Sequence, residues 1–159
     1  MKLALSEIYG IIGKNADLGI EKTKRSYIDA FYSEKTGLFC DTPKTLHSAV
    51  HSNIFPLLFG MARDIPGLES RIVSLLKEKR LKSMGVYMAY FALAALKSIG
   101  EFDLCCELAC DDAAWLNMVR EGASVTFEAW GKEQKWNTSL FHPWAVAPLI
   151  IFNDGARPY

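Results

Sequence analysis

An uninterrupted apolar run over residues 85–96 constrains this chain more than any other segment. The run begins shortly after Lys82 and ends just before Lys97, so it is too short to span a bilayer and fits a buried helix better. A helix over residues 86–99 would be apolar on nearly every side, and such a helix is expected to be buried all round. The rest of the chain therefore has to supply elements that cover it.

Most of the remaining chain also shows helical spacing of apolar residues and little strand signal. The pattern predicts helices at residues 18–31, 53–63, 68–79, 103–110 and 113–120, and a last helix after Pro143. Pro56 is expected in the first turn of its helix, where a missing N–H costs little. Residues 121–142 are expected to be rich in loops. Paired helices with short connections predict stacked helical hairpins in one all-α domain over residues 1–159, although a generic bundle or solenoid for protein binding fits the same pattern.

The charges of the 159 residues balance, with 18 Lys+Arg against 18 Asp+Glu. A nucleic-acid binder usually shows a basic excess or stripe, and the sequence has neither, so no nucleic-acid partner is expected. No apolar segment is long enough to predict a membrane partner. A net charge near zero gives little repulsion between copies of the chain, which permits self-association.

The N-terminal sequence MKLALSEIYGIIG contains one lysine, a glutamate inside its apolar stretch and no clear cleavage site of small residues. We therefore interpret it as part of the mature protein rather than as a signal peptide. This interpretation predicts a cytoplasmic location.

The cysteines and histidines do not form a recognisable metal site. Three of the four cysteines fall within residues 105–110, in one predicted helix, and their spacing matches no common zinc pattern. His47 and His51 are four residues apart but lack a third ligand, so structural hydrogen bonding or substrate contact is expected of them. Phosphate-binding loops, dinucleotide fingerprints and serine-hydrolase elbows are not found in the sequence. The sequence thus predicts no metal, no cofactor and free thiols in a reducing compartment.

All four tryptophans lie in the last third of the chain, where Trp130 and Trp136 bracket a polar loop. Exposed tryptophan is typical of binding surfaces, and the apolar face of a sugar packs well on an indole ring. The alternative is that these large rings fill a helical core. Glu128 lies between Phe127 and Trp130, where partial desolvation is expected to raise its pKa toward the range useful for proton transfer. Most glutamates, however, are solvated surface residues.

Four blocks follow one another along the chain: HSAVHSNIFPLLFG at 47–60, GVYMAYFALAALKSIGEFDLC at 85–105, WLNMVREGASVTFEAW at 115–130 and HPWAVAP at 142–148. The first is similar to a pattern H-S-x-x-H-A-N-x-F-x-L-x-F-G, the third to Gly-[AS]-[ST]-x-T-x-x-E-x-W, and the fourth to a His-x-Trp segment. In this combination, residues 20–152 resemble the C-terminal half of the catalytic domain of bacterial α-L-rhamnosidases, glycoside hydrolase family 78.

The resemblance implies an (α/α)6 barrel of six helical hairpins, of which this chain would supply about half. Members of the family hydrolyse terminal α-L-rhamnosides with inversion. One carboxylate protonates the leaving oxygen, and a second activates water across a gap of about 6.5–9.5 Å. The resemblance places Glu128 in the position of this general base. It also implies residues that contact the substrate or support its pocket: His142, Trp130, Trp136, Trp144, His51 and Tyr87.

The chain departs from the family at the general acid. The family carries this acid in a segment with an Asp-x-x-x-Arg-Asp-Glu-like pattern, which the sequence lacks, and Asp29, Asp111 and Asp112 lie outside any such motif. Each proton-transfer partner contributes on the order of 10²–10⁴-fold to the rate, so the chain alone is expected to be incomplete or inactive.

Half a barrel would expose an apolar surface. The resemblance therefore predicts a homodimer, or association with a missing N-terminal half-barrel, with a rhamnose-containing glycan or glycoside as ligand. The alternative is a non-catalytic helical module for carbohydrate binding or assembly, in which Glu128 would point into solvent or be held in a structural ion pair.

Overall fold

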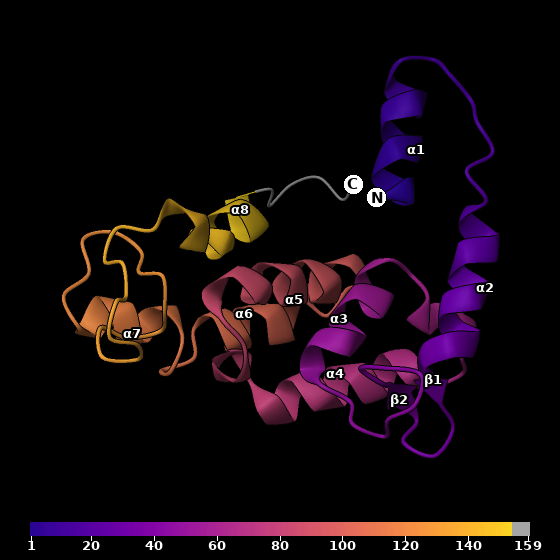
Figure 1. The fold of residues 1–159 in the computed structure, drawn as a ribbon. Helices are drawn as coiled ribbons and strands as arrows, with labels where there is room; N and C mark the ends of the chain where they lie inside the picture. The colour runs from indigo at the N-terminus through magenta and orange to yellow at the C-terminus, as the bar shows by residue number, and fades with distance from the viewer. Residues whose placement is uncertain (154–159) are drawn as a thin grey trace.

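Helix α5 (Val86–Ser98) lies at the centre of the fold in the computed structural model, which describes residues 1–153. Three helices pack against it: α3 (Val50–Leu58), α6 (Phe102–Ala109) and α8 (Ala147–Asn153). The apolar run that defines α5 is thus covered by elements from both sides of it in the sequence (Figure 1).

The remaining elements are helices of 6–12 residues, two short strands and three 3-10 turns. They are α1 (Lys2–Ile11), α2 (Ile20–Phe31), β1 (Tyr32–Ser33), β2 (Leu38–Phe39), α4 (Leu68–Lys79) and α7 (Trp115–Arg120), with 3-10 turns η1 (Ala62–Asp64), η2 (Leu81–Ser83) and η3 (Pro143–Ala145). The strands β1 and β2 form an antiparallel hairpin, and it is the one sheet within the described part of the chain. The expectation of a predominantly helical fold is confirmed.

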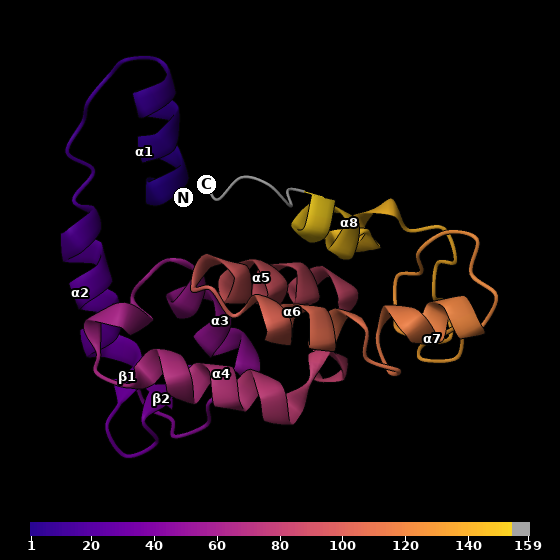
Figure 2. The same ribbon diagram turned by 180° about the vertical axis from the view of Figure 1, so that it is seen from behind.

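The helices contact one another in a regular order. Helix α3 packs against α5, the next helix but one along the chain, and α5 packs against α8, from which α6 and α7 separate it in the sequence. Helix α4 packs on α3, and α6 packs on α5. Both views of the ribbon show α4, α3, α5 and α6 stacked in one body, with α8 above α5 and α7 at one end (Figure 2).

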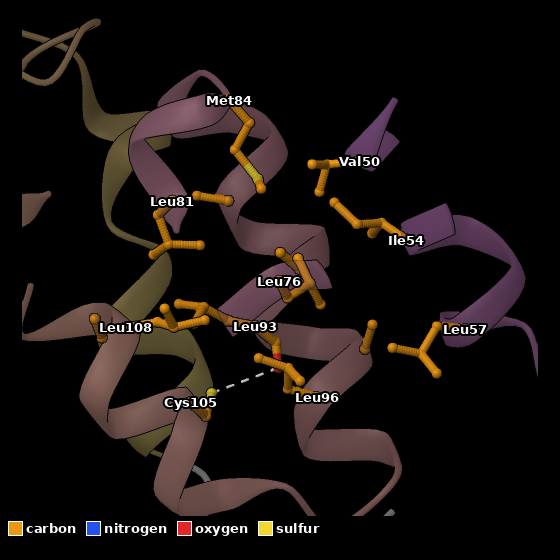
Figure 3. Close-up of a cluster of buried hydrophobic side chains, with 14 of the residues drawn as sticks. Val50, Ile54, Leu57, Leu76, Leu81, Met84, Leu93, Leu96, Cys105 and Leu108 are labelled. Atoms are coloured by element: carbon orange, nitrogen blue, oxygen red, sulfur yellow. Dashed lines mark hydrogen bonds between the residues drawn. The ribbon is translucent and has the colours of Figure 1, made fainter. Parts of the chain in front are cut away.

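The core lies where α3, α4, α5 and α6 meet. Many of its side chains are aliphatic, and among the most deeply buried are Leu57 of α3, Leu76 of α4, Leu93 of α5 and Leu108 of α6. Figure 3 shows these side chains in one cluster. Burial of each such side chain stabilises the fold by about 1.5–3 kcal/mol, which explains why the apolar positions of the sequence predict these helices well.

Helix α3 begins at Val50, three residues before the expected start at Asn53, and Pro56 lies inside it rather than in its first turn. The cause is a side chain from the preceding loop. The Asp41 carboxylate accepts hydrogen bonds from the Ala49 backbone N–H (2.9 Å) and from Ser52 Oγ (2.5 Å). These bonds satisfy donors at the helix N-terminus, so the helix starts earlier than its apolar pattern indicates.

The expected all-round burial of α5 is not met. Tyr87 is 53% exposed and Phe91 of the same helix is half-buried, so one face of α5 is open. Across residues 1–153, α5 is the longest helix with 13 residues, and none of the helices has the length and apolar character needed to cross a membrane.

Helix α1 stands apart from the core. None of its residues is buried, and its Lys2 Nζ donates a hydrogen bond to Thr23 Oγ1 of α2 (2.8 Å). Both ribbon views show it above the first part of α2 and away from α5 (Figures 1 and 2).

Candidate functional site

Glu128 lies in the long loop between α7 and η3, where two stretches of backbone run beside each other. The Glu128 N–H donates to the Ser139 carbonyl (2.9 Å), and the His142 N–H donates to the Thr126 carbonyl (2.8 Å). Thr126 Oγ1 returns a hydrogen bond to the His142 carbonyl (2.6 Å). This pairing brings the backbone at Glu128 close to the backbone at His142.

Both carboxylate oxygens of Glu128 have partners. Oε1 accepts from Lys135 Nζ at 2.5 Å, and Oε2 accepts from the Ser139 backbone N–H at 3.1 Å. The carboxylate side chain is 33% exposed. The Lys135 ammonium group first, and then the Ser139 N–H, lower the pKa of Glu128 below its ordinary value, and the nearby His142 adds a smaller effect in the same direction. Glu128 is therefore ionised at neutral pH.

This direction corrects the expectation that aromatic neighbours raise the pKa of Glu128. The Phe127 and Trp130 side chains are buried in the core, whereas the Glu128 side chain is one-third exposed. Desolvation does raise the pKa, but its effect is smaller than that of the hydrogen bonds from Lys135 and Ser139. The sequence neighbours of a loop residue thus differ from its neighbours in space.

Trp130 is a supporting residue of this region. Its side chain is 4% exposed, its Nε1 donates to the Met84 carbonyl (2.7 Å), and its ring meets the Trp115 ring edge to face at 4.9 Å. Trp115 Nε1 in turn donates to the Ala145 carbonyl (2.5 Å). The two indoles fasten the loop to the start of α5 and to η3, which fixes the backbone on either side of Glu128.

The two other tryptophans of the predicted site point outward. Trp136 is 97% exposed at the tip of the loop, and Trp144 is 69% exposed in η3. The Trp144 ring lies 5.9 Å from the Tyr87 ring of α5, measured between centroids. Trp144 and Tyr87 are therefore on one surface.

A row of aromatic rings continues from Trp144 across α5 and α3. We call the five residues Trp144, Tyr87, Phe91, Phe55 and Phe59 the aromatic row. Their successive ring centroids are 5.9, 5.6, 5.2 and 5.8 Å apart. Four of these side chains are exposed, and that of Phe91 is half-buried. The row extends along the open face of α5 onto α3.

His51 is also exposed on α3, four residues and so about one helical turn before Phe55. The resemblance implies Tyr87, Trp144 and His51 as site residues but not Phe55, Phe59 and Phe91, which extend the same surface. A signal for them was present, because Phe55 with Phe59 and Tyr87 with Phe91 have the i, i+4 spacing of side chains that share a helix face.

The aspartates considered as general acids are placed unfavourably for that role. Asp111 accepts a hydrogen bond from Arg80 Nε (2.6 Å) and another from the Ala113 N–H (2.8 Å), and these contacts lower its pKa. Asp112 pairs with Arg120 (2.8 Å), and Asp29 is exposed on α2. A general acid has to be protonated before the reaction. The lowered pKa of Asp111 favours the ionised form, which cannot donate a proton.

Two further groups of side chains are structural. His47 Nδ1 hydrogen-bonds to the Asp41 carboxylate, which is held by Ala49 and Ser52 as described above. Burial raises the pKa of the Cys105 thiol to about 12, so this thiol stays protonated at neutral pH. All four cysteines are free, and no group of three or more metal-ligating side chains occurs within residues 1–153.

Comparisons of the chain with protein-family models, with curated proteins and with solved structures found no match. The functional conclusion therefore depends on the residues and contacts above, together with the resemblance of the four sequence blocks.

Proposed function

We propose that this chain is a glycoside hydrolase-like domain of the α-L-rhamnosidase type, in which Glu128 is the general base for inverting hydrolysis of terminal α-L-rhamnosides. The observation that carries the proposal is the pairing that places the ionised Glu128 carboxylate beside His142, close in the chain to the exposed Trp144. A general base has to be ionised to accept a proton from water, and Glu128 meets this requirement.

The packing order of the helices supports a place in an (α/α)6 barrel. In such a barrel the first helices of successive hairpins contact one another, and the second helix of each hairpin packs outside them. The contacts of α3 with α5, of α4 with α3 and of α6 with α5 fit this order, and α8 rather than α7 takes the next place beside α5. We propose that the chain supplies about half of the ring.

The missing general acid determines which substrate can test the proposal. Hydrolysis of α-L-rhamnosyl fluoride needs a base but little protonation of the leaving fluoride. We expect the full chain to hydrolyse this substrate with inversion. We expect Glu128→Gln to lose at least about 10²-fold in rate, because it removes the group that accepts the water proton. Fluoride release and the product anomer by NMR measure both expectations.

Glu133→Gln is the matched control, since Glu133 is an exposed carboxylate in the same loop. We expect this variant to keep the wild-type rate. Equal rates in wild type and Glu128→Gln, with unchanged circular dichroism, would contradict the assignment of Glu128 as the base.

The proposed assembly partner is a second copy of the chain or a separate N-terminal half-barrel. The reason is the amount of exposed apolar surface, which includes the aromatic row and Leu149 and Ile150 of α8. Surfaces of this kind mark interfaces between proteins. We expect light scattering at micromolar concentration to give a mass above 17.8 kDa, and a monomer mass would count against the half-barrel.

A second candidate function is a non-catalytic module that binds carbohydrate. The contacts of Glu128 with Lys135 and Ser139 favour this alternative, because both oxygens of the carboxylate are engaged within the loop. Rhamnoside binding that depends on Trp144, without hydrolysis of the fluoride, would select this function over the first.

A further inference from the structure

We infer that Lys135 is a positioning residue that masks Glu128, so that the carboxylate can act as a base only when the Lys135 side chain leaves it. This inference rests on the proposed function. It starts from the contact at Oε1, where Lys135 Nζ occupies the side of the carboxylate that Ser139 leaves open. With both oxygens engaged, a water molecule competes with Lys135 for the same acceptor.

The loop is built to keep Lys135 in place. The Lys135 carbonyl accepts hydrogen bonds from Thr138 Oγ1 (2.9 Å) and from the Thr138 N–H (3.2 Å). One residue earlier, Gln134 Oε1 accepts from the Trp130 N–H (2.6 Å), and Trp130 is anchored in the core. The backbone of Lys135 is thus fixed on both sides, and its position above Glu128 follows from the closure of the loop.

The other basic groups near Glu128 have different partners. Lys132 Nζ donates to the Glu121 carbonyl (2.5 Å) and lies over the Phe127 ring, 5.9 Å from its centroid. His142 lowers the pKa of Glu128 less than Lys135 does. Lys135 is therefore the cation that contacts the Glu128 carboxylate and lowers its pKa most.

The contact is also easy to break. The Lys135 side chain is 40% exposed, and ion pairs at this level of exposure contribute little to stability. The next residue along the chain is Trp136, whose side chain is almost wholly in solvent. A sugar that stacks on Trp136 would contact the residue next to Lys135 in the chain. Substrate binding and the departure of the Lys135 side chain from Glu128 would then involve the same short segment.

The masking has a defined chemical consequence. In the hydrolysis of rhamnosyl fluoride, the water oxygen forms a bond to the anomeric carbon, and the C–F bonding pair leaves with fluoride. The proton lost by the water passes to Glu128. A carboxylate paired with an ammonium group is a weaker base, and the pair excludes the water from Oε1. Removal of Lys135 should therefore increase the rate.

The test uses the full chain with Lys135→Met, which keeps the length of the side chain and removes its charge. We expect the pKa of Glu128, measured by NMR titration of its ¹³C-labelled carboxyl, to rise toward its ordinary value. Hydrolysis of α-L-rhamnosyl fluoride at neutral pH should increase about two- to fivefold. The acid limb of the pH–rate profile should move to higher pH, because this limb reports the pKa of the base.

Two variants serve as controls. Lys132→Met removes a neighbouring lysine that does not contact Glu128, and we expect the pKa of Glu128 and the rate to stay at wild-type values. Lys135→Arg keeps the positive charge and should keep the pKa of Glu128 low. An unchanged pKa of Glu128 in a folded Lys135→Met protein, or a rate below that of wild type, would overturn the inference.

The outcome for the proposed function can be separated from this result. If the pKa of Glu128 rises in Lys135→Met but no variant hydrolyses the fluoride, the contact is supported and the catalytic assignment of Glu128 fails. If hydrolysis depends on Glu128 but does not respond to Lys135→Met, the assignment stands and the masking role is overturned.

Discussion

Replacement of Trp130 by alanine is expected to destabilise the fold by about 3–5 kcal/mol, as is usual when a buried indole is removed. Trp130 packs against Trp115 and donates its Nε1–H to the Met84 carbonyl, which would lose this donor in the variant. Met84 lies two residues before α5 and Trp130 lies in the same loop as Glu128, so the substitution removes a contact that joins these two parts of the chain. Urea unfolding followed by far-UV circular dichroism measures the effect.

Trp136→Ala is the matched control for this prediction. Its side chain is in solvent, so the free energy of unfolding should stay within about 0.5 kcal/mol of wild type. If Trp130→Ala also fell within about 1 kcal/mol of wild type, the loop would not be part of the core. The placement of Glu128 relative to α5 would then lose its main support.

The contrast between these two tryptophans shows what the sequence could predict. Both lie in the last third of the chain and bracket one polar loop, and nothing in that spacing separates them. The difference arises in space, because the loop turns Trp130 into the core and Trp136 away from it. Loop direction depends on hydrogen bonds such as that between the Trp130 N–H and Gln134, and no periodicity in a sequence reports these.

The helices were more predictable than the loops for a physical reason. Helices α4, α5 and α6 bury a regular apolar face, so the spacing of their leucines and alanines specifies them directly. Helix α1 was missed although it contains leucine and isoleucine, since it buries none of its residues. The start of α3 was not predicted because the carboxylate at this end of the helix belongs to Asp41, which lies eight residues before Ala49. The Ala49 N–H donates a hydrogen bond to it.

The candidate site was predictable only in part. The resemblance placed Glu128 and His142 near each other, and the structure does bring their backbones together through Thr126 and Ser139. Lys135 was not identified, because a lysine in a polar loop carries no signal of its partner. Its importance follows from loop closure, which is also why the direction of the Glu128 pKa shift could not be obtained from the neighbouring residues in the sequence.

Asn53→Leu is expected to destabilise the fold by about 3 kcal/mol or more, even though leucine has a similar volume. Asn53 is fully buried, and its Oδ1 accepts from the Phe39 N–H (3.0 Å) while its Nδ2 donates to the Ala49 carbonyl (2.9 Å), to Ser48 Oγ (2.9 Å) and to the Phe39 carbonyl (3.2 Å). Each buried group left without a partner costs about 1–3 kcal/mol. Thermal and urea unfolding of the variant measure the loss.

The same substitution at Asn137, an exposed residue of the loop, should change the free energy of unfolding by no more than about 0.5 kcal/mol. A small effect at both positions would mean that water or a shifted backbone satisfies Phe39 in the variant. A large effect at Asn53 alone would show that this side chain holds β2 against the start of α3. Because α3 carries Phe55 and is followed directly by Phe59, the position of two of the five rings of the aromatic row depends on one buried amide that lies outside the row itself.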